Sequence, residues 1–178
     1  MSEFMITKIV FGVFLSIGGM VLIFLSFKIY YKYLIMEKRC VSKTKGMVKK
    51  YTLVNYGGIH LPVVYYEVDG QEYKVKGPEY KFVISKSVST PFSENAMEYK
   101  EKKQNLIINR TVNSLVGAYR NPASELYPIN SKIDVFYDPN NPKLAYVLRY
   151  CNKKIFFWVM FITGILVLVL DLLILICL

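Results

Sequence analysis

Side chains that could carry out catalysis or bind a metal are few and scattered in this sequence. His60 is the only histidine, and the cysteines Cys40, Cys151 and Cys177 form no CxxC pair. A protein metal site needs several such ligands at matched spacings. His60 also follows a Gly-Gly-Ile turn at 57–59, which favours an exposed or loop-bound imidazole. The sequence therefore predicts no metal site and no cofactor.

The acidic residues of the central region give no recognisable acid–base pair. Asp134 and Asp138 share one face of a predicted strand, but Asp138 precedes Pro139 and is more simply explained as a turn former. The chain also lacks a nucleophile elbow, a phosphate-binding loop, an HExxH motif and a dinucleotide-binding fingerprint. We therefore expect a non-enzymatic protein.

Asp171 lies within an apolar stretch around which the rest of the chain is organised. This stretch, 155–178, has about 24 residues and would form roughly 36 Å of helix, against a hydrocarbon core of about 30 Å. Its apolar residues contribute roughly −7 kcal/mol of insertion free energy, and Asp171 costs at most about 3 kcal/mol. The stretch therefore predicts a transmembrane helix.

A second apolar stretch, 9–27, follows a short N-terminal tail at 1–8 and is long enough for one bilayer crossing. A cleavable signal peptide is the alternative, but the run is long for one and no small-x-small cleavage site follows it. The helix is expected to continue to about residue 38. Residues suited to the headgroup region follow the apolar run: Lys28, Tyr30, Tyr31, Lys32 and Tyr33.

Small residues predict that the two spans pack as an antiparallel hairpin. Gly12, Ser16 and Gly19 fall at i, i+4 and i+7 on one helical face. Thr163 and Gly164 lie near the middle of the second span. Because small side chains let helix backbones approach closely, we expect these five residues to form the packing surface.

Asp171 needs a partner inside such a hairpin. In an antiparallel alignment it comes opposite residues 11–12, about one turn from Lys8. We therefore predict an intramembrane Lys8–Asp171 pair, with a hydrogen bond to Thr7 as the alternative. A proton or ion relay is the functional alternative, but a single acid without intramembrane ionisable partners does not favour it.

The net charge of +10 is concentrated beside the two spans. The basic residues at these flanks are Lys28, Lys32, Lys38, Arg39, Lys43, Lys45, Lys143, Arg149, Lys153 and Lys154. The positive-inside rule then predicts a multi-pass plasma-membrane protein with a cytoplasmic central region and both termini outside. Anionic lipid headgroups account for these bases, so the bilayer is an expected partner and nucleic acid is not.

The cysteines beside the spans allow two interpretations. Cys40 and Cys151 lie near span ends on the same side, which makes a disulfide geometrically possible. Two free thiols in a reducing compartment are the alternative. Cys177 lies within the second span.

The central region, 39–152, predicts a small antiparallel β-sheet that curls into a partial barrel. Its predicted strands are 46–55, 61–68, 71–76, 133–137 and 144–148. The fold class is therefore membrane α+β, in which two transmembrane helices form an antiparallel hairpin and flank a β-rich domain.

Two turns join strands of this predicted sheet. Asp69-Gly70 lies between β-rich runs, and this dipeptide favours a hairpin turn with positive φ at both positions. Asp138, Pro139 and Pro142 belong to a second tight turn, Asp-Pro-Asn-Asn-Pro.

An inserted segment, 78–128, separates the two halves of the sheet. A strand is expected from Phe82 to Val88. Ser93 can cap a helix that runs to about Leu106, supported by a Glu–Lys pair at i, i+4. Residues 113–128 are expected to form a loop punctuated by prolines.

The order of these motifs resembles a known family. A span is followed by Gly46-Met47-Val48, then by the Tyr-rich run 64–73, then by VFYDPNNPKLA at 135–145, and finally by a second span. This arrangement resembles the bacterial membrane proteins of domain-of-unknown-function family 3592, and the YDPxNP turn is its most specific element. The resemblance implies a small β domain between spans, but it implies no activity and no catalytic residue.

These features favour a non-enzymatic interaction or accessory module of a membrane complex. Its partner would be another protein or a second copy, and a toxin-immunity role is one form of this function. A membrane enzyme or lipid-processing factor is a second hypothesis, which requires polar residues that converge near the membrane interface. A small oligomeric channel or transport subunit is a third.

Overall fold

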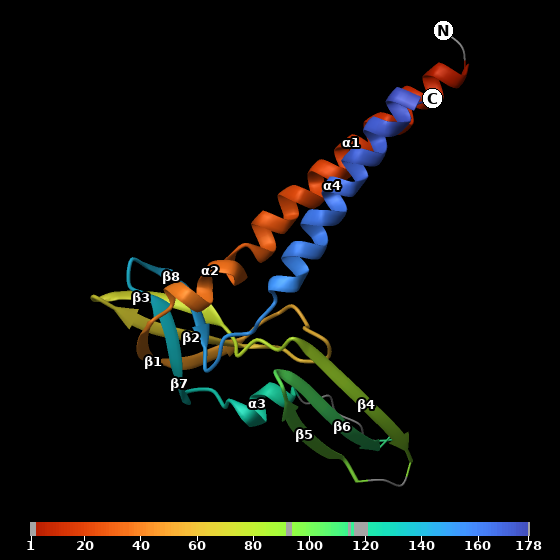
Figure 1. The fold of residues 1–178 in the computed structure, drawn as a ribbon. Helices are drawn as coiled ribbons and strands as arrows, with labels where there is room; N and C mark the ends of the chain where they lie inside the picture. Colours follow the sequence, from red (N-terminus) through yellow and green to blue (C-terminus); the bar gives the residue numbers. More distant parts are fainter. Residues whose placement is uncertain (1–2, 92–93, 114, 116–120, 178) are drawn as a thin grey trace. The chain divides into compact units, whose positions relative to one another are not determined.

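The computed structural model describes residues 3–91, 94–113, 115 and 121–177 (Figure 1). The chain forms two compact units. The helical unit comprises Met1–Ile35 and Asn152–Leu178, and the β-rich unit comprises Met36–Cys151. Both ends of the chain therefore contribute to the helical unit, and the middle of the chain builds the sheets.

Two long apolar helices lie side by side in the helical unit (Figure 1). They are α1 (Glu3–Leu25) and α4 (Lys154–Cys177). Each helix is long enough and apolar enough to cross a membrane. The tail expected at 1–8 is instead helical from Glu3 onward. The helix α1 therefore begins before the apolar run at 9–27.

A π-helical turn, η1 (Ser26–Tyr30), follows α1 and precedes α2 (Lys32–Arg39). Ser26 is fully buried, and its hydroxyl donates to the carbonyl of Ile23 at 2.7 Å. A serine that bonds to the preceding turn of its own helix favours a bend, and π-turns often interrupt α-helices. The helical path therefore ends at Arg39, close to the predicted residue 38, but with a widened turn that the sequence did not predict.

The larger sheet of the β-rich unit has five antiparallel strands in the order β3-β2-β1-β7-β8. These strands are β1 (Ser42–Tyr51), β2 (Pro62–Val68), β3 (Gln71–Lys76), β7 (Lys132–Asp138) and β8 (Asn141–Val147). The edge strands β3 and β8 contact each other, so the sheet is nearly closed. The five predicted strands and the partial barrel are confirmed, although β1 begins before the predicted residue 46.

Alternate residues of these strands fill a single core. The buried side chains are Val48, Val64, Tyr66, Val68, Ile133, Val135, Ala145 and Val147. Gly46 lies against this core, and a Cβ at this position would overlap the side chain of Val64 and lie 2.9 Å from Val135. The closeness of the neighbouring strands explains why this position has no side chain.

The Asp69-Gly70 hairpin turn has the backbone conformation that its sequence favours. Asp69 has φ of 52° and Gly70 has φ of 75°. These two residues join β2 to β3, whose register runs from Val68 opposite Gln71 to Val63 opposite Lys76. The positive φ at both positions matches the twist of the flanking strands.

A smaller sheet has three strands in the order β4-β6-β5. They are β4 (Phe82–Thr90), β5 (Ala96–Lys102) and β6 (Asn105–Asn113). β4 runs parallel to β6, and β5 runs antiparallel to it. The strand predicted from Phe82 is confirmed, but the predicted helix running to Leu106 is wrong.

The helix prediction fails because β5 and β6 pair as a hairpin. The turn of this hairpin lacks the glycine or asparagine that usually marks one in a sequence. Lys103 and Gln104 both have positive φ, at 48° and 68°, without a glycine or asparagine. In β5, partly buried Met97 is flanked by the exposed Ala96 and Glu98, a local alternation that fits a strand as well as a Glu–Lys spacing fits a helix. Ser93, the expected helix cap, lies outside the described residues.

A second core lies under the smaller sheet. Its buried residues are Ile59, Leu61, Tyr80, Leu106 and Ile108. A short helix, α3 (Pro122–Leu126), begins after Asn121, whose side chain accepts the N–H of Ala123. The loop expected at 113–128 therefore includes a helical turn, and its residues 114 and 116–120 lie outside the described part of the chain.

Candidate functional site

The interface between α1 and α4 contains most of the small residues that were expected to pack there. Gly12, Gly19 and Gly164 are buried. A Cβ at Gly19 would lie 2.7 Å from Leu168 and 3.0 Å from the carbonyl oxygen of Gly164, and a Cβ at Gly164 would meet Ile23 at 2.7 Å. The two backbones thus approach most closely at Gly19 and Gly164, where a side chain would not fit.

Thr163 does not take part in this packing. Its side chain is exposed, whereas its neighbour Gly164 is buried. Consecutive helical residues point about 100° apart, so only one of the two can face α1. The expectation for Thr163 is therefore wrong.

Asp171 is buried in the same interface and accepts a hydrogen bond from the hydroxyl of Ser16 through its Oδ2 atom. Its Oδ1 atom has no hydrogen-bond partner among the described residues, and a Cβ at Gly12 would lie 3.2 Å from it. Gly12 therefore leaves the room that this carboxyl group occupies.

The predicted Lys8–Asp171 pair is replaced by two other contacts. Lys8 donates from Nζ to the carbonyl oxygen of Leu175 at 2.9 Å, one turn beyond Asp171. Ser16 takes the place of Lys8 because its hydroxyl is short enough to meet the carboxyl group inside the interface. The alternative bond to Thr7 cannot be placed, since that side chain lies outside the described part of the structure.

Aromatic residues gather at the end of the helical unit that includes η1. Phe27 meets Phe157 edge-on at 5.3 Å between ring centroids, and Tyr30 stacks on Phe156 at 5.8 Å. The ring of Tyr33 lies 4.7 Å from Lys32 Nζ and 5.5 Å from Lys153 Nζ. Rings beside lysine side chains are typical of a membrane–water boundary.

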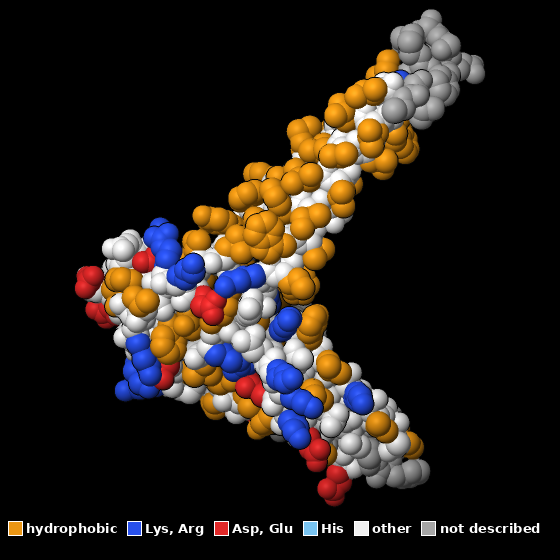
Figure 2. Space-filling model, in the orientation of Figure 1, with side chains coloured by type: hydrophobic (Ala, Val, Ile, Leu, Met, Phe, Trp, Pro, Cys, Tyr) orange, Lys and Arg blue, Asp and Glu red, His pale blue; other side chains and the backbone are white. Residues whose placement is uncertain are grey.

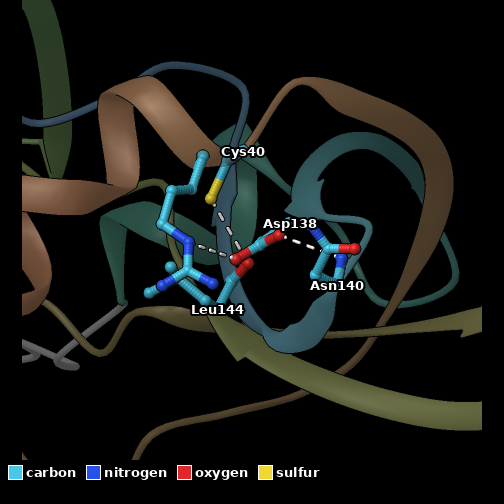
Figure 3. Close-up of polar contacts among 5 residues, drawn as sticks. Cys40, Asp138, Asn140 and Leu144 are labelled. Carbon is cyan, nitrogen blue, oxygen red and sulfur yellow. Dashed lines mark hydrogen bonds and ion pairs between the residues drawn. The ribbon is translucent and has the colours of Figure 1, made fainter.

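In the β-rich unit, the Asp-Pro-Asn-Asn-Pro turn is fixed by a buried carboxylate (Figure 3). Asp138 Oδ1 accepts the backbone N–H of Asn140 at 3.0 Å. Its Oδ2 atom lies 2.8 Å from Arg39 Nε, in an ion pair whose angles fall outside those of a hydrogen bond. Asp138 is only 1% exposed, so its charge is stabilised by the turn and by the guanidinium group of Arg39.

The turn itself brings together Asp138, Pro139, Asn140 and Pro142. The carbonyl oxygen of Pro142 accepts the hydroxyl of Tyr66 at 2.5 Å, which ties the turn to β2. Burial, with neighbouring Cys40, Tyr73 and Tyr137, raises the pKa of Tyr66 to about 12. These contacts hold the turn in place. The Asn140 N–H and the Tyr66 hydroxyl each donate to an acceptor in the turn, and the Asp138 carboxylate is paired with Arg39.

Cys40 completes this cluster (Figure 3). Its thiol is buried and donates to the carbonyl oxygen of Leu144 at 3.3 Å. Burial and the nearby Asp138 carboxylate raise the pKa of Cys40 to about 11, against the opposing effect of Arg39. Cys40 and Cys151 are both buried and are not joined by a disulfide, so the disulfide alternative is wrong.

The face of the five-stranded sheet that points away from its core carries charges of both signs. On this face Asp134 pairs with Lys43 at 2.9 Å and with Lys45. The hydrogen bond from Lys45, followed by that from Lys43, holds the pKa of Asp134 below its ordinary value. A groove with a cavity volume of about 360 Å³ lies beside them. Its lining includes Lys45, Met47, Lys49, Tyr65, Glu72 and Lys132.

His60 has a structural role. Its Nδ1 atom lies 2.7 Å from the carbonyl oxygen of Thr52, and its backbone N–H donates to Asn121 Oδ1 at 3.0 Å. Asn121 Nδ2 donates back to the carbonyl oxygen of His60 at 2.9 Å. These bonds join the loop after β1 to the start of α3, as expected for a loop-bound imidazole.

Sequence reasoning missed two of the contacts in these clusters. Ser16 was expected only as a small packing residue, and Arg39 only as a flanking base. Ser16 instead donates to the buried carboxyl group of Asp171, and Arg39 pairs with that of Asp138. For Asp171 the available clue was an isolated acid within an apolar segment, because such a group needs a donor from the neighbouring helix. Among the described residues, no group of three or more His, Cys, Asp or Glu side chains could hold a metal ion.

Comparison with known proteins adds no relative. No protein-family model, no curated protein and no solved structure matches this chain.

Proposed function

We propose that this chain is an integral membrane protein whose α1 and α4 cross the bilayer as an antiparallel hairpin. The observation that carries the proposal is the surface of these helices, which is apolar and exposed over most of its length (Figure 2). Phe14 is 70% exposed and Leu166 is 61% exposed. Leaving such surface in water costs about 25 cal/mol per Å², whereas lipid removes that cost.

The β-rich unit is proposed to lie in the cytoplasm beneath the plasma membrane. Lysine and arginine residues flank both helices on the side of the chain that leads into this unit, which supports that orientation. The closeness of the Tyr33 ring to Lys32 and to Lys153 supports a headgroup boundary at the same end of the helical unit.

Within this anchored protein, the β-rich unit acts as a non-enzymatic interaction or accessory module. The Cys40 thiol, with a pKa of about 11, is protonated at neutral pH and is therefore a poor nucleophile. Asp138 is only 1% exposed, and its carboxylate is held by the Asn140 N–H and by the Arg39 guanidinium group. Both observations support a structural role for the cluster.

The groove on the charged face of the larger sheet supports an interaction role. Met47 and Tyr65 provide apolar floor, and Lys49, paired with Glu72 at 2.7 Å, lies over the ring of Tyr65. Aromatic and methionine side chains surrounded by charges of both signs suit the surface of a partner protein. An accessory subunit of an envelope complex, or an immunity-type protein, would use such a face. The motif resemblance to family 3592 supports the same architecture.

Membrane insertion is tested by fractionating cells that express the full chain and washing the membranes with alkaline carbonate. The expected result is that the protein stays in the membrane pellet and is released only by detergent. A chain that remains soluble and monodisperse without detergent would overturn the proposal.

Orientation is tested separately with a membrane-impermeant maleimide. Lys50→Cys places a thiol on an exposed position of β1. In intact spheroplasts this thiol should be protected, and in lysed spheroplasts it should react fully. Equal labelling in both samples would place the β-rich unit outside and reject the orientation without affecting the membrane assignment.

A further inference from the structure

The loop between β1 and β2 holds the most exposed large apolar side chain in the described part of the chain. This side chain is Leu53, which is 97% exposed, and its neighbour Val54 is 62% exposed. For comparison, Phe14 on the surface proposed to face lipid is 70% exposed. Adjacent apolar side chains that stand this far out of a folded unit mark a candidate interaction surface.

Hydrogen bonds within the loop fix its base. The backbone N–H of Thr52 donates to the carbonyl oxygen of Leu61 at 2.8 Å, and the N–H of Leu61 donates to Thr52 Oγ1 at 3.0 Å. The N–H of Tyr56 donates to the carbonyl oxygen of Ile59 at 2.8 Å. Ile59 and Leu61 are buried in the core under the smaller sheet. The loop is therefore anchored on that core, and its apolar tip lies on the surface.

The segment that contains this tip is basic. Between Ser42 and Tyr66 the chain has four lysines and no aspartate or glutamate. Three of these lysines pair with carboxylates of other strands, but Lys50 is exposed and has no ion pair among the described residues. Arg110 also reaches the loop, because its Nη2 atom donates to the carbonyl oxygen of Gly58 at 2.9 Å. Aliphatic side chains beside bases are typical of segments that bind the headgroup region of an anionic bilayer.

The proposed anchoring keeps a bilayer within reach of this loop. The β-rich unit begins at Met36 and ends at Cys151, and both ends continue directly into the helical unit. A unit of this size has a radius of gyration of about 13 Å, so its surface stays close to the bilayer that holds α1 and α4. Tethering raises the local concentration of lipid, so even a small apolar tip can stay bound. A soluble partner protein has no such advantage.

We propose that Leu53 and Val54 insert into the headgroup region of an anionic bilayer, with Lys50 and Arg110 close to the lipid phosphates. This inference rests on the membrane anchoring proposed above, and it names the lipid surface as a further partner of the β-rich unit. The aliphatic side chains leave water on contact, and the bases gain anionic neighbours. The contact adds a second attachment to the one that the spans provide.

The contact is tested with single tryptophans in the full chain, reconstituted into vesicles of phosphatidylglycerol and phosphatidylcholine that is brominated on its acyl chains. Trp158 is the only tryptophan and is 51% exposed on α4, so its quenching in the wild type reports the anchoring. Leu53→Trp, combined with Trp158→Phe, reports the loop. Tyr99→Trp in the same background is the matched control, at a 42% exposed position of β5. Bromine should quench L53W at least twofold and remove less than a tenth of the emission of Y99W.

The outcomes separate this inference from the anchoring. Quenching of Trp158 without quenching of L53W, or equal quenching of L53W and Y99W, would overturn the loop contact and leave the anchoring intact. An unquenched Trp158 would reject the anchoring and this inference together.

Lys50→Glu tests the anionic part of the contact. In the L53W chain it should reduce the quenching by at least half, because a carboxylate is repelled by the headgroup phosphates. Lys100→Glu, at an exposed position of β5, is the control and should leave the quenching unchanged. An equal effect of the two variants, or full quenching after phosphatidylglycerol is replaced by phosphatidylcholine, would overturn the anionic surface as the partner.

Discussion

Ser16 donates a hydrogen bond to Asp171 across the interface between α1 and α4. This contact gives one oxygen of the only acidic group within α4 a donor from the neighbouring helix. It lies between two close-packed glycine positions, Gly12 and Gly19. The small residues of α1 therefore have two roles, because they admit the partner backbone and also make space and a donor for Asp171.

We predict that Ser16→Ala destabilises the helix pair by about 1 kcal/mol, because it leaves Asp171 without a donor in an apolar interface. Asp171→Leu should remove most of the effect of Ser16→Ala, since the group that needs the donor is gone. A double-mutant cycle measured by steric trapping of the full chain in detergent checks the coupling. Additive effects would contradict the contact, and Thr163→Ala, at an exposed position, should be near neutral.

Two adjacent glycines of α1 provide a matched test of helix packing. Gly19→Ala should destabilise the helix pair by about 1–3 kcal/mol, because the added Cβ would lie 2.7 Å from Leu168. At Gly18 a Cβ would meet no described residue within 4 Å, so Gly18→Ala should be neutral or should stabilise the helix by up to about 1 kcal/mol. The same unfolding assay ranks the two variants, and a reversed order would show that α1 turns a different face toward α4.

Asp138 is predicted to hold the turn between β7 and β8. Asp138→Ala removes the acceptor of the Asn140 N–H and the partner of Arg39, and it should cost about 1–3 kcal/mol. Asp138→Asn keeps the acceptor and should cost less. Thermal unfolding followed by circular dichroism measures both. Asp134→Asn, at a surface ion pair, is the control, and a loss there as large as for Asp138→Ala would argue against a special role for the turn.

The stability of the β-rich unit is predicted to fall in alkaline solution. The folded pKa of Cys40 is about 11, above the ordinary value of 9.0, so the folded state keeps a proton that the unfolded state loses between these values. The stabilisation is fully present below pH 9 and is lost as pH rises through about 11. Denaturant midpoints between pH 7 and 11 should show this fall.

Cys40→Ala is expected to flatten that pH dependence above pH 9 and to leave its shape below pH 9 unchanged. Tyrosines with raised pKa values, among them Tyr66 and Tyr150 at about 12, would account for a fall that persists at the highest pH in this variant. An identical alkaline profile in the variant and the wild type would show that Cys40 does not contribute.

Local sequence was sufficient wherever the physical cause is local. The apolar runs predicted α1 and α4, because length and hydropathy alone decide whether a helix is compatible with lipid. Asp69-Gly70 predicted its hairpin, because the turn demands positive φ at two adjacent positions. The β-rich runs between turn residues predicted the five strands of the larger sheet, because composition and turn chemistry are also local.

Tertiary structure decided the contacts that join distant segments. The parallel pairing of β4 with β6 and the turn at Lys103 and Gln104 override a plausible helix, because burial of Leu106 and Ile108 outweighs a local Glu–Lys spacing. The partner of Asp171 likewise depends on the rotation and depth of α1 against α4, which close packing at Gly19 and Gly164 fixes. A sequence determines which side chains are available, but only the packing of the backbone determines which of them meet.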